Sequence, residues 1–245
     1  MNRLVALALL LGGCAVPLSQ TPPAGMSAAV TAPEIRVGDT WSYGVRDGYT
    51  GLERTNVRYQ VTEIGADRVR VAVSGEPGDG IQVYDRGWNW LKRPATNLQT
   101  FEYSPAYPAL AFPLAPGKRW RAQVTARDPV DGRRFQVWIA GTVLGWERVK
   151  VPAGEFDALK IQRIVFLNYW EYAVRDRSEI LEHEWYAPAV KQAVRREAQS
   201  QHLSYRYGQT DYPRFQYAGD MSDDGGPRYI RDDWLIYELM SYSAR

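Results

Sequence analysis

The fold is decided by stretches such as Val57-Arg58-Tyr59-Gln60-Val61-Thr62, in which apolar and polar side chains alternate with a period of two. Successive side chains of a strand point to opposite faces, so this pattern gives one face to a core and the other to water. The alternation recurs over 68–73, 119–124 and 135–143, and further strand candidates lie at 159–166, 180–186, 190–198 and 234–242. Turn signals rich in Gly, Pro and Asp lie at 65–67, 77–80, 129–132 and 152–154. No stretch carries a long apolar stripe at helical spacing, so the sequence predicts an all-β protein of roughly ten to thirteen antiparallel strands.

The chain also repeats part of itself. Three short segments recur in the same order about 80 residues later: 38–41 at 117–120, 65–71 at 145–151, and 75–76 at 154–155. This predicts a duplicated meander, with tandem halves at about 36–110 and 115–200, followed by a C-terminal loop and strand. Two such meanders can pack as a two-sheet sandwich or curl into a half-open barrel, and either arrangement buries the apolar faces.

The N-terminus has the layout of a bacterial lipoprotein signal. A single basic residue, Arg3, precedes a short apolar run over 4–11, and the small residues Gly12 and Gly13 lead to Cys14. The run is far shorter than the roughly 20 apolar residues that cross a bilayer. Cys14 is also the only cysteine in the chain. We therefore expect residues 1–13 to be removed as a signal peptide and Cys14 to carry the acyl chains that anchor the protein in a membrane.

The residues after Cys14 indicate where the body of the protein lies. Lipoprotein sorting generally uses Asp after the lipidated cysteine for retention in the inner membrane, so Ala15 favours the outer membrane, with the protein facing the periplasm. Residues 14–33 contain four prolines and no charge, which predicts a flexible tether. Such a tether spans about 25 Å as a coil and roughly 60 Å at full stretch. The β domain, 34–245, is then expected to float off the membrane surface.

Composition excludes several function classes. The chain has 30 basic and 28 acidic residues, so it has no strong field and nucleic acid is not an expected partner. With Cys14 lipidated, no thiol is left for a disulfide, a metal site or a nucleophile. The chain contains 9 Trp, 16 Tyr and 6 Phe, which either fill a β core or line a groove, and the core is the favoured interpretation. The most conspicuous of these aromatic residues are Trp41, Tyr84, Trp88, Trp90, Trp170 and Trp185.

No motif predicts a catalytic residue, a metal or a cofactor. In Glu182-His183-Glu184, strand alternation places the two carboxylates on one face and His183, with Leu181 and Trp185, on the other, so the three cannot converge on a metal. His202 is the only other histidine, and no G-x-S-x-G elbow is present. Residues 220–225 imitate the start of a calcium loop, but Arg231 stands where the bidentate glutamate should be. They lie in a predicted long surface loop over 208–233.

One run resembles a known family. Residues 151–161, VPAGEFDALKI, resemble a V-P-A-G-x-F-x-A-x-K-I run of a bacterial domain family of unknown function (domain of unknown function 3108) found in periplasmic proteins and lipoproteins. Members later carry a W-Y-A-P segment that leads into a basic strand, which corresponds here to 185–188 and 190–196. The resemblance covers roughly 115–200 and implies an antiparallel β fold in the cell envelope. It implies no catalytic residues.

Three functions are compatible with these observations. The first is a non-enzymatic envelope lipoprotein at the outer membrane, whose β body is a structural module or binds an envelope protein or a lipid ligand. The second is a carrier of lipid or lipoprotein with an apolar β cavity, although no amphipathic helix is available to close such a cavity. The third is a hydrolase of cell-wall glycan, for which no acid/base pair is readable. A continuous apolar cavity would favour the carrier, whereas a filled core with an exposed aromatic patch would favour the binding protein.

Overall fold

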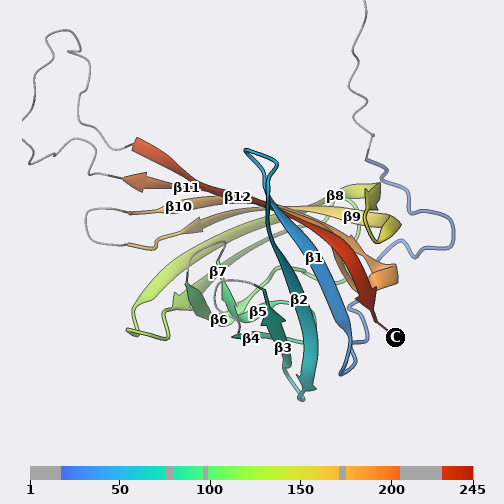
Figure 1. Ribbon diagram of the computed structural model, residues 1–245, viewed down its shortest axis with the longest axis horizontal. Coiled ribbons are helices and arrows are strands. Elements are labelled where there is room, and N and C mark those ends of the chain that lie inside the picture. Colours follow the sequence, from blue (N-terminus) through green and yellow to red (C-terminus); the bar gives the residue numbers. More distant parts are fainter. Residues whose placement is uncertain (1–17, 76–79, 96–98, 171–174, 205–227, 245) are drawn as a thin grey trace, which may run out of the picture.

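The computed structural model describes residues 18–75, 80–95, 99–170, 175–204 and 228–244. Within these ranges twelve antiparallel strands form one closed barrel (Figure 1). The strands are β1 (Thr40–Asp47), β2 (Glu53–Ile64), β3 (Val69–Ser74), β4 (Gly80–Tyr84), β5 (Trp90–Pro94), β6 (Thr100–Tyr107), β7 (Arg119–Arg127), β8 (Arg134–Val151), β9 (Gly154–Leu167), β10 (Ser178–Ala187), β11 (Gln192–Ser204) and β12 (Arg228–Ser243). The predicted all-β, antiparallel class is confirmed.

The predicted packing, a two-sheet sandwich or a half-open barrel, is wrong. Each strand pairs with the next along the chain, and β12 returns to pair with β1 from Thr40↔Ser243 to Asp47↔Leu235. This last pairing supplies partners for the backbone groups that an open sheet would leave at its two edges. The alternating pattern specifies which face of each strand is buried, but it carries no information on whether the first and last strands meet.

Alternation along each strand fills the barrel. In β2, Val57, Tyr59 and Val61 are buried while Arg58 and Gln60 face solvent, as the sequence predicts. The same alternation extends over most of the 18 residues of β8. Each aliphatic side chain buried in this way stabilises the fold by about 1.5–3 kcal/mol. The barrel is therefore held by apolar side chains that point inward from every side.

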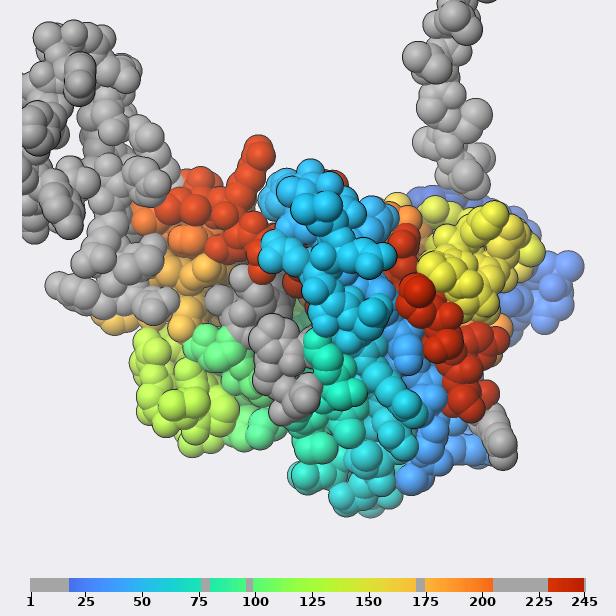
Figure 2. Space-filling view, viewed as in Figure 1, coloured from blue at the N-terminus to red at the C-terminus, as the bar shows by residue number. Residues whose placement is uncertain are grey.

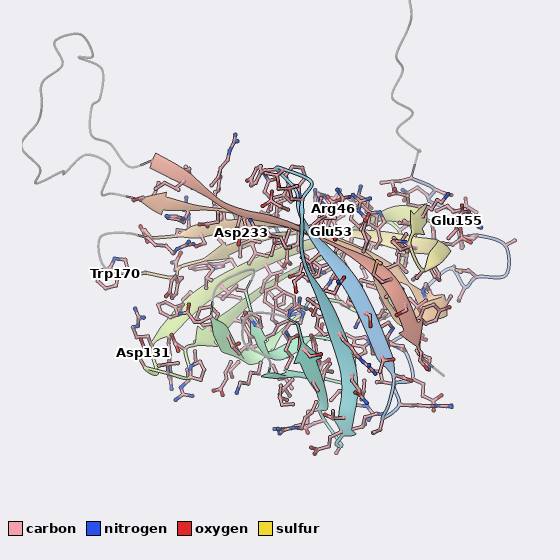
Figure 3. The ribbon with its side chains drawn as sticks, viewed as in Figure 1. Arg46, Glu53, Asp131, Glu155, Trp170 and Asp233 are labelled. Atoms are coloured by element: carbon pink, nitrogen blue, oxygen red, sulfur yellow. The ribbon has the colours of Figure 1, made fainter. Side chains whose placement is uncertain are left out.

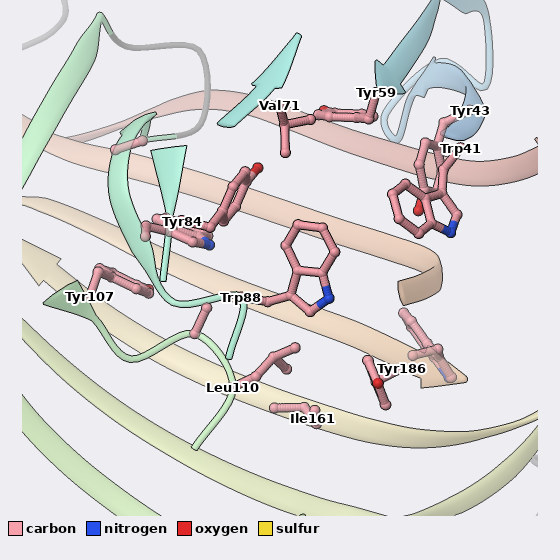
Figure 4. Close-up of a cluster of buried hydrophobic side chains, with 14 of the residues drawn as sticks. Trp41, Tyr43, Tyr59, Val71, Tyr84, Trp88, Tyr107, Leu110, Ile161 and Tyr186 are labelled. Atoms are coloured by element: carbon pink, nitrogen blue, oxygen red, sulfur yellow. The ribbon is translucent and has the colours of Figure 1, made fainter. Parts of the chain in front are cut away.

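Aromatic rings occupy much of the interior (Figure 4). The ring of Trp41 meets that of Trp88 edge-on with centroids 5.6 Å apart, and Trp90 stacks on Tyr107 at 4.1 Å. Of the aromatic residues that the sequence singled out, Trp41, Tyr84, Trp88, Trp90 and Trp185 are buried, whereas Trp170 is exposed. The interpretation of these aromatics as core residues therefore holds for Trp41, Tyr84, Trp88 and Trp90, whereas Trp185 is buried on the outer face of the barrel and Trp170 is exposed.

A short 3-10 helix, η1 (Pro188–Val190), joins β10 to β11 next to this aromatic cluster. The indole N–H of Trp41 donates to the carbonyl of Val190 at 2.8 Å, and that of Trp88 donates to the carbonyl of Lys191 at 3.1 Å. These bonds fix the β10–β11 connection to the interior rings, so the connection is part of the packed core. Among the described residues no helix is long and apolar enough to span a membrane.

The internal repeat corresponds to one structural unit, a turn followed by a hairpin. Gly38 has a positive φ of 93° and donates its N–H to Val61 at the end of the β1–β2 hairpin, and Gly117, with φ 81°, donates likewise to Val143 in the β7–β8 hairpin. The second match is not structurally equivalent, since 65–71 spans the β2–β3 turn while 145–151 lies inside β8. The repeat therefore relates two hairpins and does not continue through the following strands.

Two predicted segments differ from expectation. Residues 18–33 of the expected flexible tether lie on the barrel, bridged to it at Ser19 and at Val30. Most of the predicted 208–233 loop, including the calcium-like 220–225, lies outside the described residues, and its final part belongs to β12. Cys14 also lies outside the described residues.

Candidate functional site

A buried charge cluster lies inside the barrel. Arg163 on β9 donates to Glu182 at 2.8 Å and to Glu184 at 2.7 Å, and both carboxylates project inward from β10. Arg163 and Glu182 are cross-strand partners, so their side chains stand on the same face, and Glu184 follows two residues later on that face. The guanidinium also donates to the carbonyl of Ala109 at 2.9 Å, and the hydroxyl of Tyr107 donates to Glu182 at 3.2 Å.

His183 points the other way, as strand alternation requires. Its ring nitrogen lies 3.1 Å from the amide nitrogen of Gln162 on the outer face of the sheet. Partial burial, and then the positive charge of Lys160, hold the pKa of His183 below its usual value. In the described part of the chain, no three His, Cys, Asp or Glu side chains are grouped so that they could hold a metal ion.

A second cation faces the interior from β11. The guanidinium of Arg196 lies between tyrosine rings, 5.3 Å from the centroids of Tyr43 and Tyr59 and 4.5 Å from that of Tyr237. It donates to the hydroxyl of Tyr59 at 3.0 Å. Burial raises the pKa of Tyr43 well above its usual value, so this ring stays neutral beside the cation.

Little space is left in this interior. One cavity, lined in part by Glu184 and Arg196, has a volume of about 20 Å³, and a second, beside Trp90 and Glu182, has about 10 Å³. Each volume suits about one water molecule. Ligand pockets usually enclose roughly 300–1,000 Å³. Neither of these two cavities is large enough for an acyl chain or a sugar.

The largest hollow, of about 510 Å³, lies between residues 25–34 and the β10–β11 connection, and two further hollows lie on the outer wall. One, of about 390 Å³, crosses β7, β8 and β9, and another, of about 330 Å³, crosses β9 to β12. Both are lined by Ile164 and Phe166, so the two hollows adjoin along β9, and we call them together the outer trough. Its apolar floor is formed by Trp138, Ile164, Phe166 and Leu181. Trp138 is 38% exposed and Ile164 is 43% exposed.

The pairing of neighbouring strands places the apolar side chains of the trough floor next to one another. Trp138 on β8 lies opposite Phe166 on β9, and Ile164 on β9 lies opposite Leu181 on β10. Each pair brings two apolar side chains together on the face that alternation normally leaves polar. The trough runs across the strands, and the six neighbouring strands from β7 to β12 give it a length of about 24 Å. Polar side chains form its two ends: Arg121 and Gln123 at β7, and Glu179, Gln199, Gln201 and Arg231 at the other end.

Glu179 is the only carboxylate among the residues that line the trough. It accepts hydrogen bonds from Tyr229 at 2.7 Å, from Gln201 at 3.1 Å and from Arg177 at 3.2 Å. Partial burial alone would raise its pKa, but these three donors outweigh burial and hold the pKa of Glu179 below its usual value. Glu179 therefore serves as a fixed anion at the rim and is poorly suited to donate a proton.

Sequence reasoning did not find this trough. The alternation in β8 predicts its buried positions, and the signal for the trough lies in the outward residues that break the pattern. Trp138 is a large apolar side chain at an outward position, and Ile164 and Phe166 repeat the anomaly on the next strand. A search for apolar residues on the polar faces of predicted strands would have marked all three.

The run that resembles a known family forms a hairpin in the structure. Residues 151–161 make the β8–β9 turn and the first half of β9, and 185–188 end β10 and begin η1. No protein-family model matches the chain, so membership of the domain-of-unknown-function family stays a prediction. A search of curated proteins also gives no match.

Three solved structures are similar to this chain. A candidate lipoprotein from Parabacteroides distasonis is 15% identical, with 89% of this chain and 100% of that chain covered and a TM-score of 0.47. A candidate exported protein with a YmcC-like fold from Bacteroides fragilis is also 15% identical, with 88% and 99% covered and a TM-score of 0.46. The hypothetical lipoprotein YmcC from Escherichia coli is 14% identical, with 83% and 84% covered and a TM-score of 0.43. At this level of similarity, no functional property is carried over to this chain.

Proposed function

We propose that this protein is a lipid-anchored protein of the bacterial cell envelope, without enzymatic activity, that binds a partner protein through the outer trough. Its place in the outer membrane, facing the periplasm, follows from the lipoprotein signal, Cys14 and Ala15. The observation that carries the binding role is the contrast between a filled interior and an open apolar trough on the outer wall.

The composition of the trough supports a protein partner. Tryptophan and arginine are enriched among the residues that dominate binding energy at protein interfaces, and polar residues form the rim that excludes water. Trp138 is flanked by Arg121 and Gln123 at one end of the trough. At the other end, Glu179 and Arg231 offer charges of opposite sign. A partner with a few apolar anchors and a polar border would match this surface.

The rival functions have less support. A carrier needs an apolar chamber, and the cavities described inside the barrel have volumes of only about 20 and 10 Å³. A glycan hydrolase needs two accessible carboxylates, one of which donates a proton. The inward pair, Glu182 and Glu184, is buried and bound by Arg163, and the rim residue Glu179 is held as an anion.

The anchor is tested by replacing Cys14 with serine. We expect complete loss of fatty-acid labelling and release of the protein from the membrane fraction, because no other cysteine can accept the lipid. Metabolic labelling with an alkyne fatty acid, followed by fractionation of the envelope, measures both effects. Labelling that persists in Cys14→Ser would show that the lipoprotein assignment is wrong.

The trough is tested by photocrosslinking in intact envelopes. A photoreactive amino acid at Gln123, on the rim, is expected to give a discrete adduct with one protein, whereas the same amino acid at Gln60, on the outer face of β2, should give none. Replacing Trp138 with alanine should reduce the Gln123 adduct about 30-fold, as expected for loss of an interface anchor. The free energy of unfolding should fall by only about 1 kcal/mol, since Trp138 is partly exposed. Equal adducts from both positions, or no effect of Trp138→Ala, would contradict a binding role for the trough.

A further inference from the structure

We propose that residues 18–35 are a strap that holds the β8–β9 end of the barrel against the lipid surface. The inference rests on the proposed lipidation of Cys14 and adds to it which part of the barrel meets the membrane. Two observations support the inference. The segment is hydrogen-bonded to the barrel at Ser19 and at Val30, and only a short length of chain separates Ser19 from Cys14.

The first point is an uncovered edge of β8. Strand β8 continues to Val151, but its pairing with β7 ends at Arg119↔Thr142, so β7 leaves the following residues of β8 without a strand partner on that side. Ser19 and Trp146 exchange backbone hydrogen bonds there, at 2.9 and 2.8 Å. The segment thus covers an edge that would otherwise present free backbone groups.

Strand β8 has local features that leave room for the segment at this edge. The amide of Gln20 donates to the carbonyl of Leu144 at 2.8 Å, next to a register shift in the β8–β9 pairing between Val143 and Gly145. Gly145 has a φ of 149°, and a Cβ at that position would lie 2.8 Å from the carbonyl oxygen of Ser19. A residue larger than glycine would therefore collide with the docked segment.

The second point fixes the other end of the strap. Val30 and Leu114 exchange backbone hydrogen bonds of 2.8 and 2.7 Å, and both side chains are buried. Ile35 is also buried, and the ammonium group of Lys191 donates to the carbonyl of Glu34 at 2.8 Å. Figure 2 shows the start of the segment against the β8–β9 hairpin, at one end of the molecule.

The link from this point to the lipid is short. Four Cα–Cα steps separate Cys14 from Leu18, and they reach at most about 14 Å. A free tether over 14–33 would reach roughly 60 Å. With Cys14 in the membrane, the edge of β8 at Trp146 therefore lies close to the lipid headgroups in every orientation that the link allows.

Strand geometry identifies near and far reference points. Glu155 pairs with Lys150, four residues beyond Trp146 along β8, which is about 13 Å. Asp131 lies beyond the other end of β8, whose first residue, Arg134, is twelve residues from Trp146, or about 40 Å. Figure 3 shows Glu155 and Asp131 at opposite ends of the molecule. Both are exposed acidic residues next to hairpin turns, so they form a matched pair.

Fluorescence quenching in lipid vesicles tests the proposal. Glu155→Cys and Asp131→Cys each introduce the only free thiol of the lipidated protein, so each can be labelled with a fluorophore at one site. Quenching by lipids with nitroxide-labelled headgroups is expected to be about threefold stronger at position 155 than at position 131, because that position stays near the tether. Ser19→Pro, which removes the N–H that bonds Trp146, and Gly145→Val should each reduce this difference to near unity.

The outcomes separate this proposal from the proposed function. Equal quenching at the two positions, in protein whose acylation of Cys14 is verified by mass spectrometry, overturns the strap and leaves the anchor standing. Absence of acyl mass on Cys14 overturns both. Ser19→Pro alters the strap and not a strand of the barrel. The quenching difference can therefore still be measured in this variant if Gly145→Val does not fold. An unchanged difference in Ser19→Pro would contradict the proposed role of the β8 edge.

Discussion

Replacing Arg163 with methionine is expected to lower the free energy of unfolding by about 3–5 kcal/mol. The substitution leaves Glu182 and Glu184 buried without their cation and leaves the carbonyl of Ala109 without its donor. Burial opposes the charge of Arg163, but the two carboxylates outweigh burial and hold its pKa above the usual value, so the side chain is a cation. Urea unfolding followed by tryptophan fluorescence, at neutral pH, measures the loss.

A triple variant provides the control for this prediction. Arg163→Met combined with Glu182→Leu and Glu184→Leu removes the whole charge cluster and fills the space with apolar side chains. Buried ion clusters can often be exchanged in this way at little cost, so most of the lost stability should return. A loss below about 1 kcal/mol in the single variant would contradict the buried, paired state of the carboxylates. A triple variant as unstable as the single one would show that the defect lies in packing and not in unpaired charge.

The charge cluster also shows which features of the fold the sequence alone does not predict. Alternation correctly separates Glu182 and Glu184 from Leu181, His183 and Trp185, but it does not state which set faces inward. Hydrophobicity alone would bury Leu181 and Trp185. The carboxylates point inward because Arg163, their partner, lies opposite Glu182 on β9, and only the strand register brings the two together.

Trp185 illustrates the same limit on the outer face. It is 5% exposed although it stands outside the barrel, because Lys160 and Arg195 from the neighbouring strands lie over its ring at 4.6 and 5.1 Å. Its indole N–H donates to Glu147 at 2.9 Å. An aromatic residue can thus be buried by long charged side chains as well as by a core. The high aromatic content correctly predicts that Trp185 is buried. It does not predict that Lys160 and Arg195, and not the core, cover the ring.

The N-terminal segment gives the clearest contrast between local and global information. Its prolines and lack of charge indicate that residues 14–33 form no core of their own, and the described part has no long strand. What holds it is the backbone edge of β8 near Trp146, more than a hundred residues away in the sequence. This edge is uncovered only because β8 extends beyond the end of its pairing with β7. Turn signals in the sequence leave strand ends uncertain by a few residues, so the uncovered edge could not be predicted.

Replacing Trp41 with alanine is the second change expected to have a large effect, a loss of about 3–5 kcal/mol in the free energy of unfolding. Trp41 is 1% exposed, packs edge-on against Trp88 and donates its indole N–H to the carbonyl of Val190. Truncation would open a cavity in the aromatic core and leave that buried carbonyl without its partner. Chemical unfolding monitored by circular dichroism, which avoids the change in tryptophan content, measures the effect.

Trp120 is the matched control, because the internal repeat places it at the same position after an equivalent turn. Its ring is half-buried and lies over Gly141, where a Cβ would come within 2.1 Å of it, and its indole N–H donates to Pro108 at 3.0 Å. Trp120→Ala should therefore cost about 1–2 kcal/mol, since less apolar surface returns to water. Equal losses for the two variants would mean that the repeated turn, and not burial in the barrel, determines the contribution of each tryptophan. A larger loss for Trp41→Ala would show that burial in the barrel, and not the repeated turn, determines the contribution of each tryptophan.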